Sequence, residues 1–182
     1  DRLSARAPLP HRLGELAPAE GKVAAPDLTG FGTKAWVLAL LDDPDADHMF
    51  GKTPFKGNMP SVVRPPADAE AAKDFKPMPQ ADRDAIAAFL EAQAKGESGA
   101  GLPGEKMVKQ RCTGCHRLDG KMDESASEDS LAPELRGWAS LAWIDAQVSD
   151  PGSGKAYPKG AMSPELKGHM PAFAEELSRE DI

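Results

Sequence analysis

The feature that most constrains this chain is a single pair of cysteines, separated by two residues and followed directly by a histidine. Residues 112–116 read Cys-Thr-Gly-Cys-His, and no other cysteine occurs among the 182 residues. A disulfide framework needs several spaced cysteine pairs, so the sequence excludes a fold stabilised in that way. The pair is therefore a redox dithiol, part of a metal site, or the anchor of a covalently bound haem.

The pattern Cys-x-x-Cys-His favours haem attachment over the other two interpretations. Two thiols at this spacing can add to two vinyl groups on one porphyrin edge, while a helical turn brings the next imidazole beneath the iron. A zinc site needs about four ligands, more than cluster here. A thioredoxin-like dithiol would follow a strand, which this neighbourhood does not predict. We therefore predict thioether bonds to Cys112 and Cys115 and axial iron coordination by His116.

A second axial ligand is predicted downstream, where residues 167–171 read Lys-Gly-His-Met-Pro. Met170 is the candidate, because a thioether opposite histidine raises the reduction potential and blocks oxygen binding, which suits electron transfer. The alternative is a core methionine beneath a loop. Other candidates for the same position are Met107, Met122, Met162 and His169.

From Gly104 to Ile182, the order and spacing of these motifs resemble class I cytochromes c. In that family a Pro-x-Leu-x-Gly segment follows the attachment motif, and residues 133–137 have this pattern. The resemblance implies that the carbonyl of Pro133 accepts a hydrogen bond from the second ring nitrogen of His116. Such a bond fixes the orientation of a ligating imidazole and increases its basicity. An ordinary turn proline would show the same spacing.

Two tryptophans accompany a helix that helical spacing of apolar residues predicts over residues 140–149. Trp138 precedes this helix, and Trp143 lies in its first turn. A haem pocket needs apolar walls, and large aromatic side chains bury much area. We expect both tryptophans to line the haem pocket and pack against the core rather than to be redox-active.

The chain contains an internal repeat. Residues 26–37 align with residues 133–144, and Lys-Gly-Asn-Met-Pro at 56–60 mirrors the segment 167–171. A further helix is predicted over residues 82–93, with its apolar residues on one face. In the family that the sequence resembles, a helix of this kind closes the domain by packing across the amino-terminal helix.

Together, the resemblance and the repeat predict an all-α fold with two tandem class I cytochrome c domains, each a few helices around a haem pocket. We expect the first domain over residues 1–95 and the second over residues 105–182. The linker, residues 96–104, is rich in glycine and serine. By comparison with the family, the first helix of the first domain and the C-terminal helix of the second are expected to be truncated.

The first copy of the repeat lacks the two haem-anchoring thiols, since Ala-Pro-Leu-Pro-His stands at residues 7–11. His11, Pro26 and Met59 nevertheless persist as a possible second site. Three interpretations remain open: the domain has lost its haem and serves as a docking module, it holds haem noncovalently through His11 and Met59, or residues 7 and 10 are wrongly identified. In the first case His11 is a solvated loop residue and Met59 a packing residue.

The charge distribution indicates which kinds of partner the protein can bind. A net charge of −7 argues against nucleic acid and favours protein partners with basic patches. Lys155, Lys159 and Lys167 lie on the approach to Met170, and lysines near an exposed haem edge commonly steer acidic partners in the family. A solvated loop is the alternative.

The resemblance implies an electron carrier that passes single electrons through a His/Met-ligated haem c in a respiratory or photosynthetic chain. Its expected partners are a quinol-oxidising bc-type complex, a terminal oxidase or soluble carriers, on the periplasmic face of a bacterial membrane. No apolar run is long enough for a membrane span, so membrane association is expected only through partners or segments outside this chain. A dihaem peroxidase-like enzyme and a haem-free docking role for the first domain are the alternatives.

Overall fold

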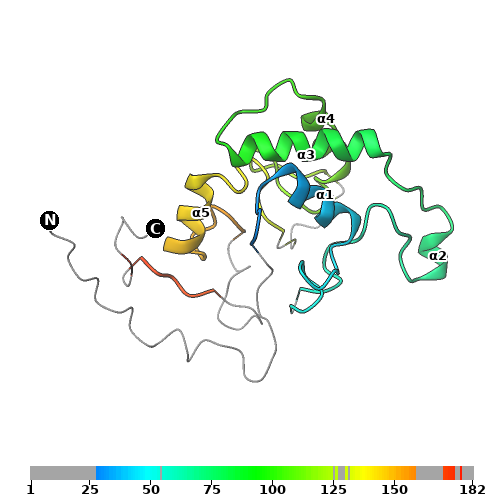
Figure 1. Ribbon diagram of the computed structural model, residues 1–182, viewed down its shortest axis with the longest axis horizontal. Coiled ribbons are helices and arrows are strands. Elements are labelled where there is room, and N and C mark those ends of the chain that lie inside the picture. Colours follow the sequence, from blue (N-terminus) through cyan, green and yellow to red (C-terminus); the bar gives the residue numbers. More distant parts are fainter. Residues whose placement is uncertain are drawn as a thin grey trace, which may run out of the picture.

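The computed structural model describes residues 28–53, 55–124, 126, 130, 132–158, 170–174 and 177. Within these residues the regular structure is helical, and β-pairing is limited to isolated bridges. The helical fold class is therefore confirmed (Figure 1). The helices are α1 (Lys34–Asp42), α2 (Ala69–Ala72), α3 (Gln80–Ala94), α4 (Pro103–Arg111) and α5 (Leu141–Ser149). None of them has the length and apolar character of a membrane-spanning helix.

The helices α1 and α5 belong to the two copies of the repeat, and they begin in the same way. The Thr33 hydroxyl accepts a hydrogen bond from the backbone N–H of Trp36, and the Ser140 hydroxyl accepts one from the N–H of Trp143, both at 3.2 Å. A hydroxyl at this position satisfies one of the N–H groups that the first helical turn leaves without a partner. The predicted start of the second helix at Ser140 thus corresponds to its N-cap.

The turn before each helix also repeats its backbone conformation. Gly30 and Gly137 have φ values of 71° and 67°, and the next equivalent pair, Gly32 and Ala139, has 81° and 58°. Glycine adopts positive φ without steric cost, whereas alanine rarely does so. The two copies of the repeat therefore share the N-cap hydrogen bond and a positive φ at both positions of the preceding turn.

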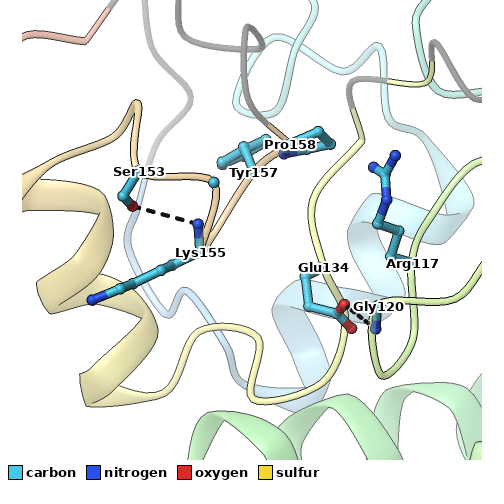
Figure 2. Close-up of a pocket in the computed structure, with 8 residues that line it drawn as sticks. Arg117, Gly120, Glu134, Ser153, Lys155, Tyr157 and Pro158 are labelled. Carbon is cyan, nitrogen blue, oxygen red and sulfur yellow. Dashed lines mark hydrogen bonds between the residues drawn. The ribbon is translucent and has the colours of Figure 1, made fainter.

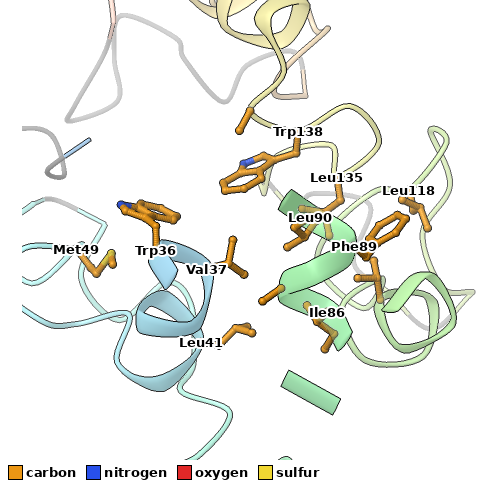
Figure 3. Packing of buried hydrophobic residues seen from close by; sticks show 13 residues of the cluster. Trp36, Val37, Leu41, Met49, Ile86, Phe89, Leu90, Leu118, Leu135 and Trp138 are labelled. Carbon is orange, nitrogen blue, oxygen red and sulfur yellow. The ribbon is translucent and has the colours of Figure 1, made fainter. Parts of the chain in front are cut away.

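The long helix α3 lies at the centre of the apolar core. It covers the predicted helix 82–93 and extends it at both ends. Its face with Ile86, Phe89 and Leu90 is buried, and the helix packs against both α1 and α4. Figure 3 shows Leu90 facing Val37 of α1, whereas Phe89 lies on the other side of α3, near Leu118. The helix predicted to close the first half therefore contacts the first helix of the second half.

The contact between α3 and α4 is close because α4 presents a glycine to it. A Cβ atom added to Gly104 would lie 2.0 Å from the carbonyl oxygen of Ala85 in α3. The helix α4 begins at Pro103, within the residues predicted as linker, since proline suits the first helical position. The two helices can approach this closely only because no side chain separates their backbones at Gly104.

One apolar cluster joins the two halves of the sequence. Gln93 of α3 links the halves as well, since its Oε1 accepts a hydrogen bond from the N–H of Gly137 at 2.9 Å. Described residues from both predicted domains therefore contribute to one apolar cluster. The buried members of this cluster are Trp36, Val37, Leu41, Met49, Ile86, Ala87, Phe89, Leu90, Val108, Leu118, Leu135, Trp138 and Ala139.

Candidate haem site

The helix α4 leads directly into the cysteine motif. The N–H of Cys112 donates to the carbonyl of Val108 at 2.9 Å, and the N–H of His116 donates to the carbonyl of Cys112 at 2.8 Å. These bonds continue the helical turn through the motif. Both thiols are free, with Cys112 packed against the core and Cys115 exposed. The turn expected for delivering two thiols and an imidazole to one cofactor is present.

The thiol of Cys112 is not poised for redox exchange. Burial, with a smaller contribution from Cys115, raises the pKa of Cys112 to about 11. A catalytic dithiol depends on a lowered pKa, because the thiolate is the nucleophile. The environment of Cys112 therefore weighs against a thioredoxin-like function.

The imidazole of His116 is held by Pro133. Its Nδ1 lies 3.0 Å from the carbonyl oxygen of Pro133, which is the contact that the resemblance implies. A carbonyl oxygen can only accept, so Nδ1 carries the proton and Nε2 keeps its lone pair. Burial lowers the pKa of His116, although the bond to Pro133 acts in the opposite direction. The result is a neutral imidazole whose Nε2 can bind a metal.

Backbone pairing holds the segment around Pro133 in place. The N–H of Leu135 donates to the carbonyl of Arg117 at 2.9 Å, just after the motif. The carboxylate of Glu134 accepts hydrogen bonds from the N–H groups of Asp119 and Gly120, at 3.0 and 2.8 Å. The loop after His116 is thereby tied to the segment that supplies its hydrogen-bond acceptor.

Arg136 connects the loop after His116 to α4, and this role was not predicted from the sequence. Its guanidinium forms ion pairs with Glu105 and Asp119, each at 2.8 Å, and lies 5.5 Å from the centroid of the Phe89 ring. Hydrogen bonds from Arg136 hold the pKa values of Glu105 and Asp119 below their ordinary range. These partners are distant in sequence, so no local motif signals the cluster.

Met170 lies against α5. Its Sδ accepts a hydrogen bond from Nε2 of Gln147 at 3.4 Å. The N–H of Phe173 donates to the carbonyl of Val148 at 3.0 Å, and the N–H of Ala174 to the carbonyl of Ser149 at 3.4 Å. The end of α5 therefore holds the Met-Pro segment, and the role of Gln147 was not expected from sequence.

The two predicted pocket tryptophans have different environments. Trp138 is 6 % exposed and packs between the copies of the repeat, with its ring centroid 4.9 Å from that of Phe31 and 5.9 Å from that of Trp36. Trp143 is half-buried, and its ring lies 5.7 Å from that of Tyr157. Its Nε1 is buried and has no hydrogen-bond partner in the part of the chain that the structure describes. Trp138 therefore packs in the core, whereas Trp143 retains an unused donor.

A cavity of about 320 Å³ lies beside the segment that follows Pro133. Figure 2 shows Arg117 and Glu134 on one side of it and Tyr157 and Lys155 on the other. Burial raises the pKa of Tyr157 to about 12, so its hydroxyl stays protonated. Lys155, one of the lysines expected near Met170, is exposed here.

The remaining candidates divide into packing residues and residues outside the described part. Met59 and Met107 are half-buried and pack against the core cluster. Met122 is half-buried and borders an open depression beside the motif. The structure thus describes Met59 but neither of its predicted companions in the second site. Outside the described residues lie His11, Pro26, Lys159, Met162, Lys167 and His169.

Comparison with known proteins concerns the second half of the chain. Residues 102–182 match the family model for cytochrome c. Neither the curated proteins nor the solved structures give a match. The family match supports a cytochrome c domain over residues 102–182, and with it covalently bound haem c and a haem-based electron-transfer role.

Proposed function

We propose that residues 102–182 carry one haem c bonded to Cys112 and Cys115, with His116 and Met170 as axial ligands, and that this domain passes single electrons between proteins. The contact between His116 and Pro133 carries the proposal, because it leaves Nε2 as the free ring nitrogen. The bound haem would supply a one-electron couple of its iron. The protein supplies the two thiols, an oriented imidazole and a thioether.

An unused polar atom on α5 supports the fit of a haem. Nε1 of Trp143 is buried and has no hydrogen-bond partner among the described residues. Buried polar groups are normally hydrogen-bonded, so this donor needs an explanation. A haem bears carboxylates that accept hydrogen bonds, and Trp143 would be a suitable donor to one of them.

The residues present favour closed iron coordination. The thioether of Met170 is held against α5 by the hydrogen bond from Gln147 and by the backbone bond from Phe173 to Val148. A peroxidase needs an open iron position, whereas a histidine and methionine pair fills both. Outer-sphere electron transfer is the chemistry that such a site supports best.

We also propose a cellular location and redox partners for the protein. We propose a location on the periplasmic side of a bacterial membrane and exchange with a quinol-oxidising complex, a terminal oxidase or soluble carriers. The net charge of −7 supports partners with basic surfaces. We further propose that the first half of the chain is a structural or docking module, because Met59 packs against the core cluster.

Haem stoichiometry and absorption spectra test these proposals. A pyridine haemochrome assay should give one haem c per chain, and the haem should remain attached on a denaturing gel. The oxidised protein should show a methionine-to-iron charge-transfer band that Met170→Ala abolishes and the control Met59→Ala retains. A wild-type protein that lacks this band and binds carbon monoxide readily would contradict the ligand assignment. Two haems per chain would instead place a second one in the first half.

A further inference from the structure

We propose that Gln147 is a positioning residue for Met170, and that its side-chain N–H group raises the reduction potential by donating a hydrogen bond to the thioether sulfur. This inference rests on the proposed role of Met170 as an iron ligand. Gln147 of α5 would change how strongly the sulfur of Met170 donates electrons to the iron.

The geometry places Gln147 where it can act on the sulfur. Its Nε2 lies 3.4 Å from Sδ of Met170, and both side chains are half-buried. Figure 1 shows the red segment that begins at Met170 alongside α5, and the bond from Phe173 to Val148 anchors it there at 3.0 Å. The sulfur and the amide therefore belong to one locally fixed arrangement.

The orientation of the amide follows from its chemistry. A thioether sulfur can accept a hydrogen bond but has none to donate, so the NH₂ group of Gln147 must face Met170. Its Oε1 then lies buried, with no hydrogen-bond partner among the described residues. Burying an unpaired amide oxygen is unfavourable, and an apolar side chain of similar size would avoid that penalty. The presence of an amide at this position indicates a role beyond filling space.

The internal repeat supplies an independent comparison. Leu40 occupies the position of α1 that corresponds to Gln147 in α5. The first copy, which lacks both thiols, thus has an apolar residue where the haem-binding copy has an amide. The polar side chain accompanies the intact attachment motif.

The effect on the iron follows from the two lone pairs of sulfur. One can bind iron while the other accepts the hydrogen bond. Electron density drawn towards the donor weakens donation to ferric iron more than to ferrous iron, so the bond favours the reduced state. Hydrogen bonding around a ligand is a recognised way for a protein to set haem potential.

The test replaces Gln147 with the residue that the first copy has. A neutral hydrogen bond corresponds to roughly a two- to tenfold change in an equilibrium constant. Gln147→Leu should therefore lower the reduction potential by about 20 to 60 mV, at about 59 mV per tenfold change for one electron. The methionine-to-iron band should persist in this variant with a displaced maximum. Potentials are measured by spectroelectrochemistry on the haem-loaded full chain.

Two further variants make the test decisive. Leu141→Ala changes an exposed residue of the same helix and should leave the potential at the wild-type value. Gln147→Asn keeps the amide but is one carbon shorter, so its potential should lie near that of Gln147→Leu. The inference is wrong if Gln147→Leu keeps the wild-type potential, or if Gln147→Asn does so while Gln147→Leu does not. Absence of the band in the wild type would instead overturn the proposed role of Met170.

Discussion

The helices α1 and α5 derive from the same repeat, yet one is buried and the other is not. The residues Trp36, Val37 and Leu41 of α1 are all buried. The equivalent residues of α5 are only partly buried, and none of its side chains is fully so. The difference comes from α3, which packs against α1 and has no counterpart on α5 among the described residues. A local sequence can specify a helix and its ends, but burial requires a partner.

Because α5 is only partly buried by the core, it can contact the segment that contains Met170. Its last turn provides hydrogen-bond acceptors for Phe173 and Ala174, and Gln147 contacts the sulfur of Met170. In α1 the corresponding position is Leu40, which packs against the core. One copy of the repeat therefore supports the shared core, while the other supports the candidate ligand.

The largest effect on stability is expected when the Phe89 side chain is removed from α3, the helix against which α1 packs. Phe89 is completely buried and lies beside Gly104 of α4, so we expect Phe89→Ala to reduce the free energy of unfolding by about 3 to 5 kcal/mol. Denaturant titration followed by circular dichroism measures this change. The exposed Leu141 serves as control, and a change to alanine there should be close to neutral. Similar losses for both variants would contradict the central role of α3.

An equivalent pair of substitutions tests the difference in burial directly. Val37 is 1 % exposed, whereas Ile144, its counterpart in α5, is half-buried. Val37→Ala should lower the free energy of unfolding by about 2 kcal/mol, and Ile144→Ala by about 1 kcal/mol or less, although isoleucine loses more atoms. Parallel denaturant titrations of the haem-free chain give both values. An equal or larger loss for Ile144→Ala would show that α5 is buried in solution.

The two N-caps should respond similarly, since each hydroxyl accepts a hydrogen bond of 3.2 Å from an N–H group of the first turn. We expect Thr33→Ala and Ser140→Ala each to cost about 1 kcal/mol, because each removes the acceptor for one N–H group of the first turn. Thr33→Ser and Ser140→Thr keep that acceptor and are the matched controls. Unequal losses, measured by thermal unfolding, would mean that the caps depend on the surrounding core.

The smallest effect on stability is expected for substitution of Arg136, which lies outside α1 and α5. Arg136 lowers the pKa values of Glu105 and Asp119, so each carboxylate contributes stability above its ordinary pKa, and that contribution is lost as the pH falls through the lowered value. Arg136→Gln should therefore flatten the acid side of the stability profile. Thermal unfolding between about pH 2 and pH 6 covers the carboxylate range. An unchanged acid slope would show that these pairs contribute nothing.

Local features of the fold were predictable because they depend on neighbouring residues. The helix over 82–93 follows from apolar spacing, and the start of α5 follows from Ser140, whose hydroxyl caps the first turn. The contact between His116 and Pro133 was implied by family resemblance, and the structure contains it. The division into two domains remains a prediction, and described residues of both halves contribute to one core cluster.

The sequence alone determined the attachment motif at residues 112–116, the helical class and the repeat, because each depends on residue types at short, regular spacings. Only the tertiary structure decided that α3 packs on α4, that Arg136 fastens the loop after the motif, and that Gln147 contacts Met170. These contacts join residues that are distant in the chain. Their formation depends on how the backbones pack, as at Gly104, and spacing in sequence does not encode that packing.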